Sequence, residues 1–536
     1  MAVTFTQEQQ ETIDARNASV LVSAAAGSGK TAVLVERIIR MVSDPDRPVD
    51  IDRLLVVTFT NAAAAQMRER ISQALSGAVD ENPQDAHLAR QLTLIHNAQI
   101  TTIDSFCLYI IRNHFDEIDL DPDFRVADEG EIRLMKQDVL HDMLEEYFQK
   151  DEEDFRSFVE FFAPLGNEKR LEEQILSLYE FAMSYPWPEE WLEEHKKDYD
   201  LTKEGLDACG FVRQLKEYIR LLLSEAERLL EQNRRLCQRP DGAYMYLDAL
   251  EADEELIRSL KKAESLQELY EGFGNLTFAR LSSKKDASVS EEAREEAKEL
   301  RQEFKDMLQE IGKKYFYASP ESQKERMEAC APQVAMLLSM TEDFCARLAE
   351  QKRKKNVLDF HDMEHLALQI LTRREGGQVV PTRTAVELRD SYAEIMIDEY
   401  QDSNLVQEFL LKSVSTEEEG RYNRFMVGDV KQSIYKFRLA RPELFMEKFD
   451  SYAHGDGSQG AKERRIDLKK NFRSRRQVTE NVNQVFSRLM GKDLGGVAYD
   501  ADAALYPGAV YKEPEREEGM PDPYLPEALL AVAGED

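Results

Sequence analysis

Residues 20–31 constrain the fold of this chain more than any other stretch. The apolar residues Val20–Val22 have the composition of a short buried parallel strand. Small residues and then Gly-Lys-Thr follow, and residues 32–39 have helical spacing. A strand, a small-residue loop and a helix are the setting of a phosphate-binding loop, because glycine lets backbone N–H groups approach phosphates at a helix N-terminus. The alternative is an ordinary strand–turn–helix unit in which Gly-Lys-Thr occurs by chance.

The loop residues have separate predicted roles. Lys30 is expected to reach the β- and γ-phosphates of a nucleoside triphosphate, and the Thr31 hydroxyl to bind Mg²⁺. Ala24 stands where the usual pattern has its first glycine, so the strict pattern fails by one residue. The residues predicted to surround the nucleotide phosphates are Ser23, Ala24, Ala25, Ala26, Gly27, Ser28, Gly29, Lys30 and Thr31.

Strand and helix patterns alternate in two separated parts of the chain. Apolar runs at 54–60 and 98–103 predict strands that are each followed by a helix, and the alternation resumes at about residue 351. Strands are predicted there at 356–360, 394–397 and 424–427. Such alternation predicts a parallel sheet with helices on both faces. The predicted fold class is therefore α/β, a P-loop NTPase (RecA-like) sheet.

The intervening residues have a different composition: they are rich in Glu, Lys, Arg and Leu, with the apolar residues at helical spacing. Breaks are expected at 186–188, which contains two prolines, and at 272–274, which contains two glycines. We predict a large all-helical insertion domain within the sheet-forming domain. The predicted organisation is residues 1–115 and 351–455 as two segments of the ATPase domain, 116–350 as the insertion, and 456–536 as a linker and the start of a second motor domain.

Composition and charge narrow the class of protein. The chain has 536 residues and a net charge of −33, which argues against nonspecific polyanion binding by its whole surface. A locally basic groove stays compatible with this charge, and residues 462–476 carry eight Lys and Arg against two acidic residues. No apolar run approaches the roughly 18 residues of a membrane span, and no secretory signal is visible. We therefore expect a cytoplasmic protein without a membrane partner.

A second strand ends in carboxylates. Ile395–Ile397 is apolar, and Asp398 and Glu399 follow directly. Ligands of open α/β sheets bind at the carboxyl ends of strands. Asp398 is therefore expected to hold Mg²⁺, and Glu399 to polarise the water that attacks the γ-phosphate.

Five motifs occur in one order along the chain. They are Thr6–Gln9 with Ile13, Thr58–Ala64, Asp398–Asp402, Val427–Arg438 and Asn471–Ser474. In that order they resemble the Q motif and the TFTNxAA, DExQD, VGDxxQSIYxFR and NYRS motifs of superfamily 1A helicases, the UvrD/Rep/PcrA group.

The resemblance implies roles around ATP. Gln9 would read the adenine with an amide that can both donate and accept, and Phe472, where the family usually has Tyr, would stack on the base. Gln432 would sense the γ-phosphate and couple it to DNA. Arg473 would stabilise the γ-phosphate charge; the alternative is an ordinary surface arginine. The implied catalytic residues are thus Lys30, Asp398, Glu399, Gln432 and Arg473.

The resemblance also implies DNA contacts, at Thr60, Asn61, Ser105, Tyr435, Phe437 and Arg438. Phe437 would stack on a base, whereas core packing is the alternative for Tyr435 and Phe437. Asp104 stands where the family commonly has His, and we expect it to cap a helix rather than to meet DNA. Residues 352–355 are expected either to contact phosphates or to form a solvated helix end.

Three further segments resemble the AddA subunits of bacterial AddAB helicase–nucleases: Ile111–Phe115, Asp121–Glu129 and Asn356–Phe360. This resemblance implies ATP and Mg²⁺ as cofactors, 3′→5′ motion on DNA, and an AddB-like nuclease partner at double-strand breaks, with contacts to single-stranded DNA and duplex ends. The family's later motifs and nuclease motif are not found, so the sequence resembles an N-terminal portion. We expect such a portion to bind ATP weakly and hydrolyse it poorly, because it lacks the second arginine finger.

Three alternatives stay open at this point. The first is a UvrD/Rep-type repair helicase without an associated nuclease. The second is a P-loop ATPase that acts on protein or RNA, against which the segment from Gln432 to Phe437 argues. The third is a non-catalytic scaffold built on the large acidic helical block.

Overall fold

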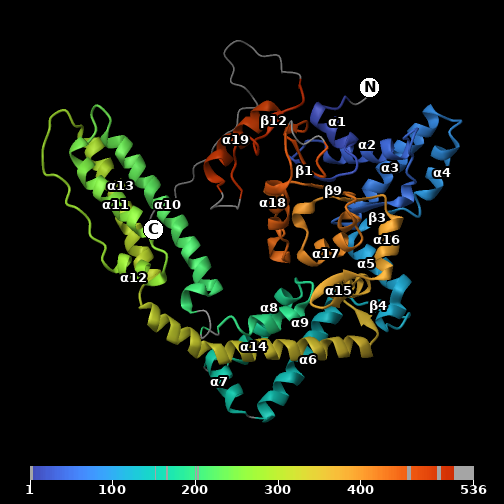
Figure 1. Ribbon diagram of the computed structural model, residues 1–536, viewed down its shortest axis with the longest axis horizontal. Helices are drawn as coiled ribbons and strands as arrows, with labels where there is room; N and C mark the ends of the chain where they lie inside the picture. Colours follow the sequence, from blue (N-terminus) through green and yellow to red (C-terminus); the bar gives the residue numbers. More distant parts are fainter. Residues whose placement is uncertain are drawn as a thin grey trace, which may run out of the picture. The chain divides into compact units, whose positions relative to one another are not determined.

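The computed structural model divides the chain into two compact units, which Figure 1 colours along the sequence. The first unit comprises Met1–Val139, Tyr179–Pro188 and Ala346–Asp536, and the second comprises Leu140–Leu178 and Glu189–Cys345. The structure describes residues 4–150, 152–164, 167–199, 201, 205–455, 460–491 and 497–511.

The first unit is built on a six-stranded parallel sheet of order β10-β1-β9-β8-β2-β3. The α/β class is therefore confirmed, and so are the strands predicted next to the loop and at 54–60, 98–103, 394–397 and 424–427. The strand β10 was not predicted. The strands are β1 (Ser19–Ala24), β2 (Leu54–Thr58), β3 (Gln99–Thr102), β8 (Glu394–Ile397), β9 (Arg424–Gly428) and β10 (Glu463–Leu468).

Alternate side chains of these strands enter two separate hydrophobic cores, because successive residues of a strand point to opposite faces. Val20 and Val22 face one core, and Leu21 faces the other. The first core is covered by α1 (Gln7–Asp14), α2 (Lys30–Val42), α3 (Asn61–Glu81) and α4 (Ala86–Leu94). The second is covered by α5 (Ile103–His114), α15 (Phe360–Leu371), α16 (Arg383–Ser391), α17 (Leu405–Ser413) and α18 (Pro442–Ser451).

Among the residues that the structure describes, three pairs of short strands lie outside the main sheet. The strand predicted at 356–360 is one of them: β5 (Val357–Leu358) pairs only with β4 (Arg125–Val126). It ends early because Asp359 caps α15 in a capping box with Asp362. The other pairs are the hairpin β6 (Thr372–Glu375) with β7 (Gln378–Pro381), and β11 (Lys470–Asn471) with β12 (Tyr506–Pro507). A last helix, α19 (Arg476–Leu489), separates β11 from β12.

The described residues of the second unit form helices and connecting segments, without a strand. Its main hydrophobic core lies among α10, α11, α12 and α13. The predicted helix breaks are confirmed, since α9 begins at Pro188 and α12 ends at Gly274. The helices that lie wholly or partly in this unit are α6 (Glu129–Lys150), α7 (Glu153–Phe162), α8 (Glu168–Ala182), α9 (Pro188–His195), α10 (Gly210–Cys237), α11 (Leu247–Lys262), α12 (Leu266–Gly274), α13 (Glu291–Tyr315) and α14 (Pro320–Lys354).

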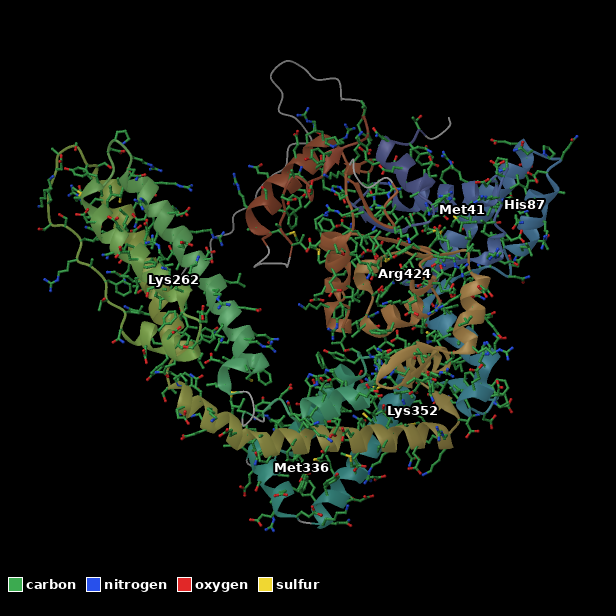
Figure 2. All side chains as sticks on the ribbon, viewed as in Figure 1. Met41, His87, Lys262, Met336, Lys352 and Arg424 are labelled. Atoms are coloured by element: carbon green, nitrogen blue, oxygen red, sulfur yellow. The ribbon has the colours of Figure 1, made fainter. Side chains whose placement is uncertain are left out.

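In the basic run at 352–355, Arg353, Lys354 and Lys355 are exposed at the end of α14, as the prediction of a solvated helix end has it, whereas Lys352 differs from both predicted states. Lys352, labelled in Figure 2, is only 4% exposed. Its Nζ lies 3.0 Å from Asp359 Oδ2 and 2.7 Å from Asp362 Oδ1. The last turn of α14 therefore neutralises the carboxylates at the start of α15, so Lys352 is neither solvated nor available to DNA phosphates. Across the described residues, no helix combines the length and the apolar character that crossing a membrane demands.

A buried charge network ties α17 and α18 to the sheet. Glu408 of α17 accepts hydrogen bonds from Arg424 of β9 and Lys448 of α18, each at 2.9 Å, and from the Tyr400 hydroxyl at 2.8 Å. Arg424, labelled in Figure 2, also pairs with Glu417 at 2.7 Å. Burial raises the pKa of Glu408, but the charges of Arg424 and Lys448 outweigh it and lower that pKa to about 2.

We expect Glu408→Gln to destabilise the first unit by about 3 kcal/mol, because it removes the carboxylate that compensates two buried cations. The folded pKa of Glu408 is depressed, so its stabilisation is present above the unfolded value of 4.5 and is lost as pH falls towards about 2. Urea unfolding across that range checks both effects. Glu443→Gln, at an exposed position of α18, is the matched control and should change neither.

Candidate active site

The loop between β1 and α2 has the backbone that its glycines permit. Gly27 and Gly29 have φ of +69° and +83°, a region that other residues rarely adopt. A Cβ on Gly27 would lie 2.8 Å from both Asn471 Nδ2 and Arg473 Cβ, so close approach also requires glycine there. The helix begins at Lys30, two residues before the predicted Ala32, and the predicted strand, loop and helix are confirmed.

Lys30 meets the end of β8. Its Nζ lies 3.1 and 3.0 Å from the two carboxylate oxygens of Glu399, although the residues are 369 positions apart. Asp398, the preceding residue, donates its backbone N–H to the Val57 carbonyl at 2.9 Å and so continues the sheet. The predicted convergence of the loop and the carboxylates at one sheet edge is therefore observed.

Negative charge is concentrated at this edge. Burial and the neighbouring Glu399 raise the pKa of Asp398 to about 6, and Lys30 opposes this shift only partly. The same two causes raise the pKa of Asp402 to about 6. The protein's own cations thus leave these carboxylates poorly compensated, which suits a divalent cation.

The metal would need ligands from beyond the protein. Within the part of the chain that the structure describes, no group of three or more His, Cys, Asp or Glu side chains is placed to hold an ion. Mg²⁺ typically takes one or two carboxylates and completes its shell with phosphates and water. Thr31 and Asp398 fit that pattern when a nucleotide supplies the remaining oxygens.

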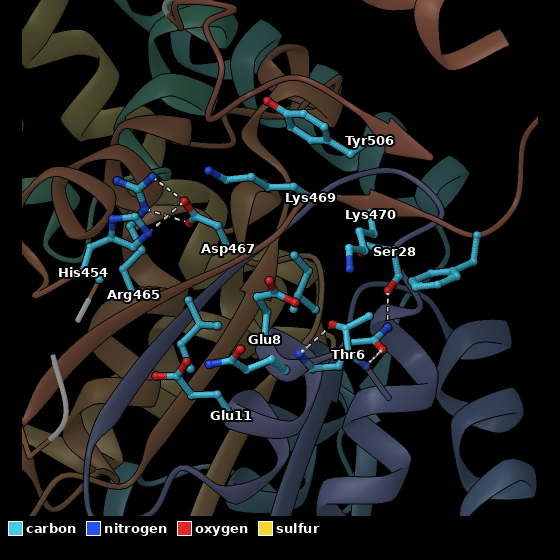
Figure 3. Close-up of a pocket in the computed structure, with 16 residues that line it drawn as sticks. Thr6, Glu8, Glu11, Ser28, His454, Arg465, Asp467, Lys469, Lys470 and Tyr506 are labelled. Atoms are coloured by element: carbon cyan, nitrogen blue, oxygen red, sulfur yellow. Dashed lines mark hydrogen bonds and ion pairs between the residues drawn. The ribbon is translucent and has the colours of Figure 1, made fainter. Parts of the chain in front are cut away.

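Gln9 connects α1 to the loop. Its Oε1 accepts the backbone N–H of Thr6 at 2.9 Å, and its Nε2 donates to the Ser28 carbonyl at 2.9 Å, drawn as a dashed line in Figure 3. These two partners fix the orientation of the amide. One N–H of the amide is left for a base, which is compatible with the predicted contact to adenine.

A cavity of about 580 Å³ lies beside this contact, within the usual range for small-molecule sites. Gln9, Ser28, Lys470 and Phe472 all line it, together with residues of β10 (Figure 3). The backbone N–H of Phe472 donates to the Gly27 carbonyl at 2.8 Å. The predicted base-binding residues therefore share one cavity, directly against the phosphate loop.

Asn471 is a site residue that sequence reasoning missed. Its Nδ2 donates to the Ala26 carbonyl at 2.7 Å, and its Oδ1 accepts the N–H groups of Arg473 and Ser474 at 2.9 and 2.7 Å. It thus holds the turn that presents Arg473 against the loop. Its position as first residue of the Asn-Phe-Arg-Ser motif was the available signal.

The basic stretch at 462–476 is less available than its composition suggests. Arg465 is buried against Asp467, Arg464 pairs with Glu11, Lys469 with Asp502 and Arg476 with Glu480. Arg473, by contrast, is exposed and has no acidic partner among the described residues. With Lys470, which is also exposed and lines the cavity, it is therefore a cation of this stretch that can meet an anion at the loop.

The predicted DNA contacts at two helix starts have clear local geometry. Thr60 caps α3 by accepting the Ala63 N–H at 3.1 Å, and Asn61 follows it on the surface. The cap of α5 is Thr102, whose Oγ1 accepts the N–H of Ser105 at 3.2 Å. The prediction that Asp104 caps this helix is therefore wrong, because the hydroxyl two residues earlier already occupies that role. Ser105 is exposed.

Aromatic rings gather at the same edge of the sheet. The ring centroids of Phe59 and Tyr435 are 4.7 Å apart, and those of Tyr435 and Phe437 are 5.9 Å apart. Arg438 lies 5.4 and 5.7 Å from the Tyr435 and Phe437 centroids. Phe437 is 76% exposed, so its core-packing alternative is wrong. Phe59 was not predicted as a site residue, although it lies inside the Thr58–Ala64 motif.

A profile of the UvrD/REP helicase N-terminal domain matches residues 5–453, well over half of the chain. The chain belongs to the UvrD/REP helicase family. The predicted resemblance to the UvrD/Rep group is thereby confirmed.

Curated relatives of this UvrD/REP family member have consistent names. An AddA-type ATP-dependent helicase/nuclease subunit of Lachnoclostridium phytofermentans is 48% identical over 515 residues, which cover 95% of this chain and 37% of that protein. Proteins of the same name from Clostridium perfringens strain 13 and Anoxybacillus flavithermus strain WK1 are each 42% identical. They cover 100% and 94% of this chain, and 42% of each relative is matched. The chain thus spans about two fifths of these relatives, and its similarity to AddA proteins is confirmed.

We expect Gln9→Ala to weaken nucleotide binding by this UvrD/REP family member about two- to tenfold, since one hydrogen bond contributes roughly 0.5–1.5 kcal/mol. The change frees the Ser28 carbonyl and loosens the loop. Titration with a fluorescent ATP analogue and Mg²⁺ measures the effect. Gln10→Ala, whose amide instead contacts Asp14, is the control. An equal loss in both variants would contradict a specific role for Gln9.

Proposed function

We propose that this chain is the ATP-driven DNA motor portion of a helicase–nuclease subunit. It binds MgATP at the loop edge of the sheet and single-stranded DNA across the neighbouring aromatic residues. The observation that carries the proposal is the contact of Lys30 with Glu399 at the sheet edge from which Phe59 and Tyr435 also project. A nucleotide site and a stacking surface at one edge are what a DNA motor needs.

The nucleotide-side roles are proposed on the contact between Lys30 and Glu399 and on the resemblance of the motifs. Lys30 leaves Glu399 to meet the β- and γ-phosphates, and Thr31 and Asp398 hold Mg²⁺. Glu399, then free of its ammonium partner, orients the attacking water and accepts its proton. Gln432 senses the γ-phosphate, and Arg473 neutralises the charge that develops there. Bound MgATP supplies the free energy of phosphoryl transfer.

The DNA-side roles rest on exposure and charge. Phe437, with Tyr435 and Arg438, forms a platform on which bases stack without regard to sequence. Thr60, Asn61 and Ser105 contact the phosphate backbone from the N-terminal ends of α3 and α5, where helix dipoles favour anions. We further propose 3′→5′ motion, action at duplex ends in double-strand break repair, an AddB-like nuclease partner and a cytoplasmic location. The three curated relatives described above are each named as a helicase/nuclease subunit, which supports a nuclease partner. The other assignments rest on the resemblance of the motifs.

The second unit is proposed to be the helical insertion domain of this motor. Its two segments lie between β4 and β5 in the chain and are separated by Tyr179–Pro188 of the first unit. Its described residues form helices without a strand. We propose that residues 1–115 and 351–455 supply the two segments of the ATPase domain. Residues 456–536 contribute β10 to the same sheet and then begin the second motor domain.

Replacement of Lys30 tests the nucleotide site. We expect Lys30→Ala to weaken binding of a fluorescent ATP analogue with Mg²⁺ about 10- to 150-fold, because hydrogen bonds to charged groups contribute roughly 1.5–3 kcal/mol. Lys412→Ala, at an exposed lysine of α17, should bind normally. If the unaltered chain does not bind the analogue at all, the proposed function is wrong.

Replacement of Phe437 tests the DNA surface. We expect Phe437→Ala to weaken single-stranded DNA binding about 5- to 150-fold, since base–aromatic stacking contributes roughly 1–3 kcal/mol. Nucleotide affinity should stay unchanged. Fluorescence anisotropy with labelled oligothymidine measures the loss. Phe360→Ala removes a similarly exposed ring on α15 and should have no effect; equal affinities of both variants would argue against the proposed surface.

A further inference from the structure

Gln401 lies between the two ligand sites and has no role in the proposed function. It follows Glu399 in the short turn after β8 and is only 1% exposed. Its Oε1 accepts the backbone N–H of Asp429 at 3.0 Å. Its Nε2 donates to Glu399 Oε2 at 2.8 Å and to Asp402 Oδ2 at 3.2 Å. One buried amide therefore joins the segment after β8 to the segment after β9.

The chemistry of the partners fixes the direction of this amide. A backbone N–H can only donate, so the oxygen of Gln401 must face Asp429 and its nitrogen must face Glu399. Gly428 permits the approach, because a Cβ there would collide with Gln401 Oε1. Gly428 does not have a positive φ, so the space and not the backbone conformation requires glycine.

Asp429 continues the path towards the DNA side. It is 1% exposed, and its Oδ2 accepts a hydrogen bond from Gln432 Nε2 at 2.7 Å. Its Oδ1 pairs with Lys431 Nζ at 2.7 Å. Gln432 itself is exposed, and three residues later Tyr435 begins the aromatic group. A continuous series of hydrogen bonds thus runs from Lys30 through Glu399, Gln401 and Asp429 to Gln432.

The first contact in this series has two alternative states. Glu399 Oε2 accepts from both Lys30 Nζ, at 3.0 Å, and Gln401 Nε2. A phosphate that takes the Lys30 ammonium leaves Gln401 as the donor that holds the Glu399 side chain. The hydrogen bond from Gln401 to Glu399 therefore differs between the two states. The contact of the Gln401 oxygen with the Asp429 N–H changes with it. Coupling between sites needs such a discrete element, which both ligands bias.

We propose that Gln401 and Asp429 are positioning residues that couple nucleotide binding at Lys30 and Glu399 to DNA binding beyond Gln432. This inference rests on the proposed function, because it presupposes that both ligands bind. Neither residue touches a ligand; Gln401 acts by orienting Glu399, and Asp429 acts by orienting Gln432. Coupling of this kind is reciprocal, so each ligand must change the affinity of the other by the same factor.

The test measures that factor in the 536-residue chain. Anisotropy of labelled oligothymidine gives the DNA Kd with and without saturating non-hydrolysable ATP analogue and Mg²⁺. Titration of a fluorescent form of the analogue, with and without DNA, gives the reciprocal factor. We expect the unaltered chain to show coupling of about 5- to 150-fold.

Two variants separate the halves of the path. Gln401→Met keeps the length of the side chain but removes its three hydrogen bonds, to Asp429, Glu399 and Asp402. Gln401→Glu can still accept the Asp429 N–H and cannot donate to Glu399. Both should reduce the coupling factor to about twofold or less, while the Kd of each ligand alone stays within about threefold. If Gln401→Met does not fold, the coupling factor of Gln401→Glu tests the inference by itself.

The chain offers a matched control in Gln91. It is fully buried, its Oε1 accepts the Ile51 N–H at 2.8 Å, and its Nε2 donates to Asp50 at 2.7 Å. Gln91→Met thus removes the same kind of bridge elsewhere, with a similar effect on melting temperature and none on coupling. Unchanged coupling in the Gln401 variants, equal loss in Gln91→Met, or no coupling in the unaltered chain overturns the inference alone. An unaltered chain that binds neither ligand overturns the proposed function as well.

Discussion

Parallel pairing of the six main strands is the constraint on which the remaining architecture depends. Because every pairing is parallel, the carboxyl ends of all six strands lie at one edge of the sheet. The strand β1 is second in the sheet, between the outermost strand β10 and β9. The segments that follow these strands therefore meet around the phosphate loop, although the chain that carries them runs from residue 24 to residue 469.

The contacts at this edge are specific consequences of that order. From β10 the chain reaches Asn471, which donates to the loop carbonyl of Ala26. From β8 it reaches Glu399, which pairs with Lys30, and from β9 it reaches Asp429. Each contact joins the end of one strand to the segment after another. A shift of register in any strand would move these groups by about 3.3 Å and separate them.

The strands that the sequence predicted are those whose residues are mostly apolar. The runs of β1, β2, β8 and β9 are apolar because both faces of the sheet are covered. The strand β10 escaped prediction because Arg464, Arg465 and Asp467 interrupt its pattern. In the structure Arg464 pairs with Glu11, a partner that only tertiary folding supplies, and Arg465 pairs with Asp467 two residues along the same strand.

The errors at single residues have different origins. Charge alone indicated that Lys352 would be solvated or bound to phosphate, whereas the fold places two carboxylates next to it. Asp104 was predicted to cap α5, whereas Thr102, two residues earlier, is the cap. Short motifs identified Gln9, Lys30 and Phe472 correctly as neighbours. The Asp398–Asp402 motif contains Gln401 but gave no role for it, because that role depends on the contact between two segments and not on either one.

Glu399 has a strained backbone, and its carboxylate is held by two hydrogen-bond donors. Its φ of +54° is in the left-handed region, which costs an ordinary residue roughly 1–2 kcal/mol. Such a conformation persists only where neighbouring contacts determine it, and they are commonly found at functional sites. Here Lys30 and Gln401 both bind its carboxylate, so the strained backbone and the paired side chain support each other. Release of Lys30 would leave Gln401 as the remaining side-chain donor to that carboxylate. The strain at the end of β8 therefore gives a physical reason why a change at the phosphate loop should alter the contacts of Asp429, which follows the neighbouring strand β9.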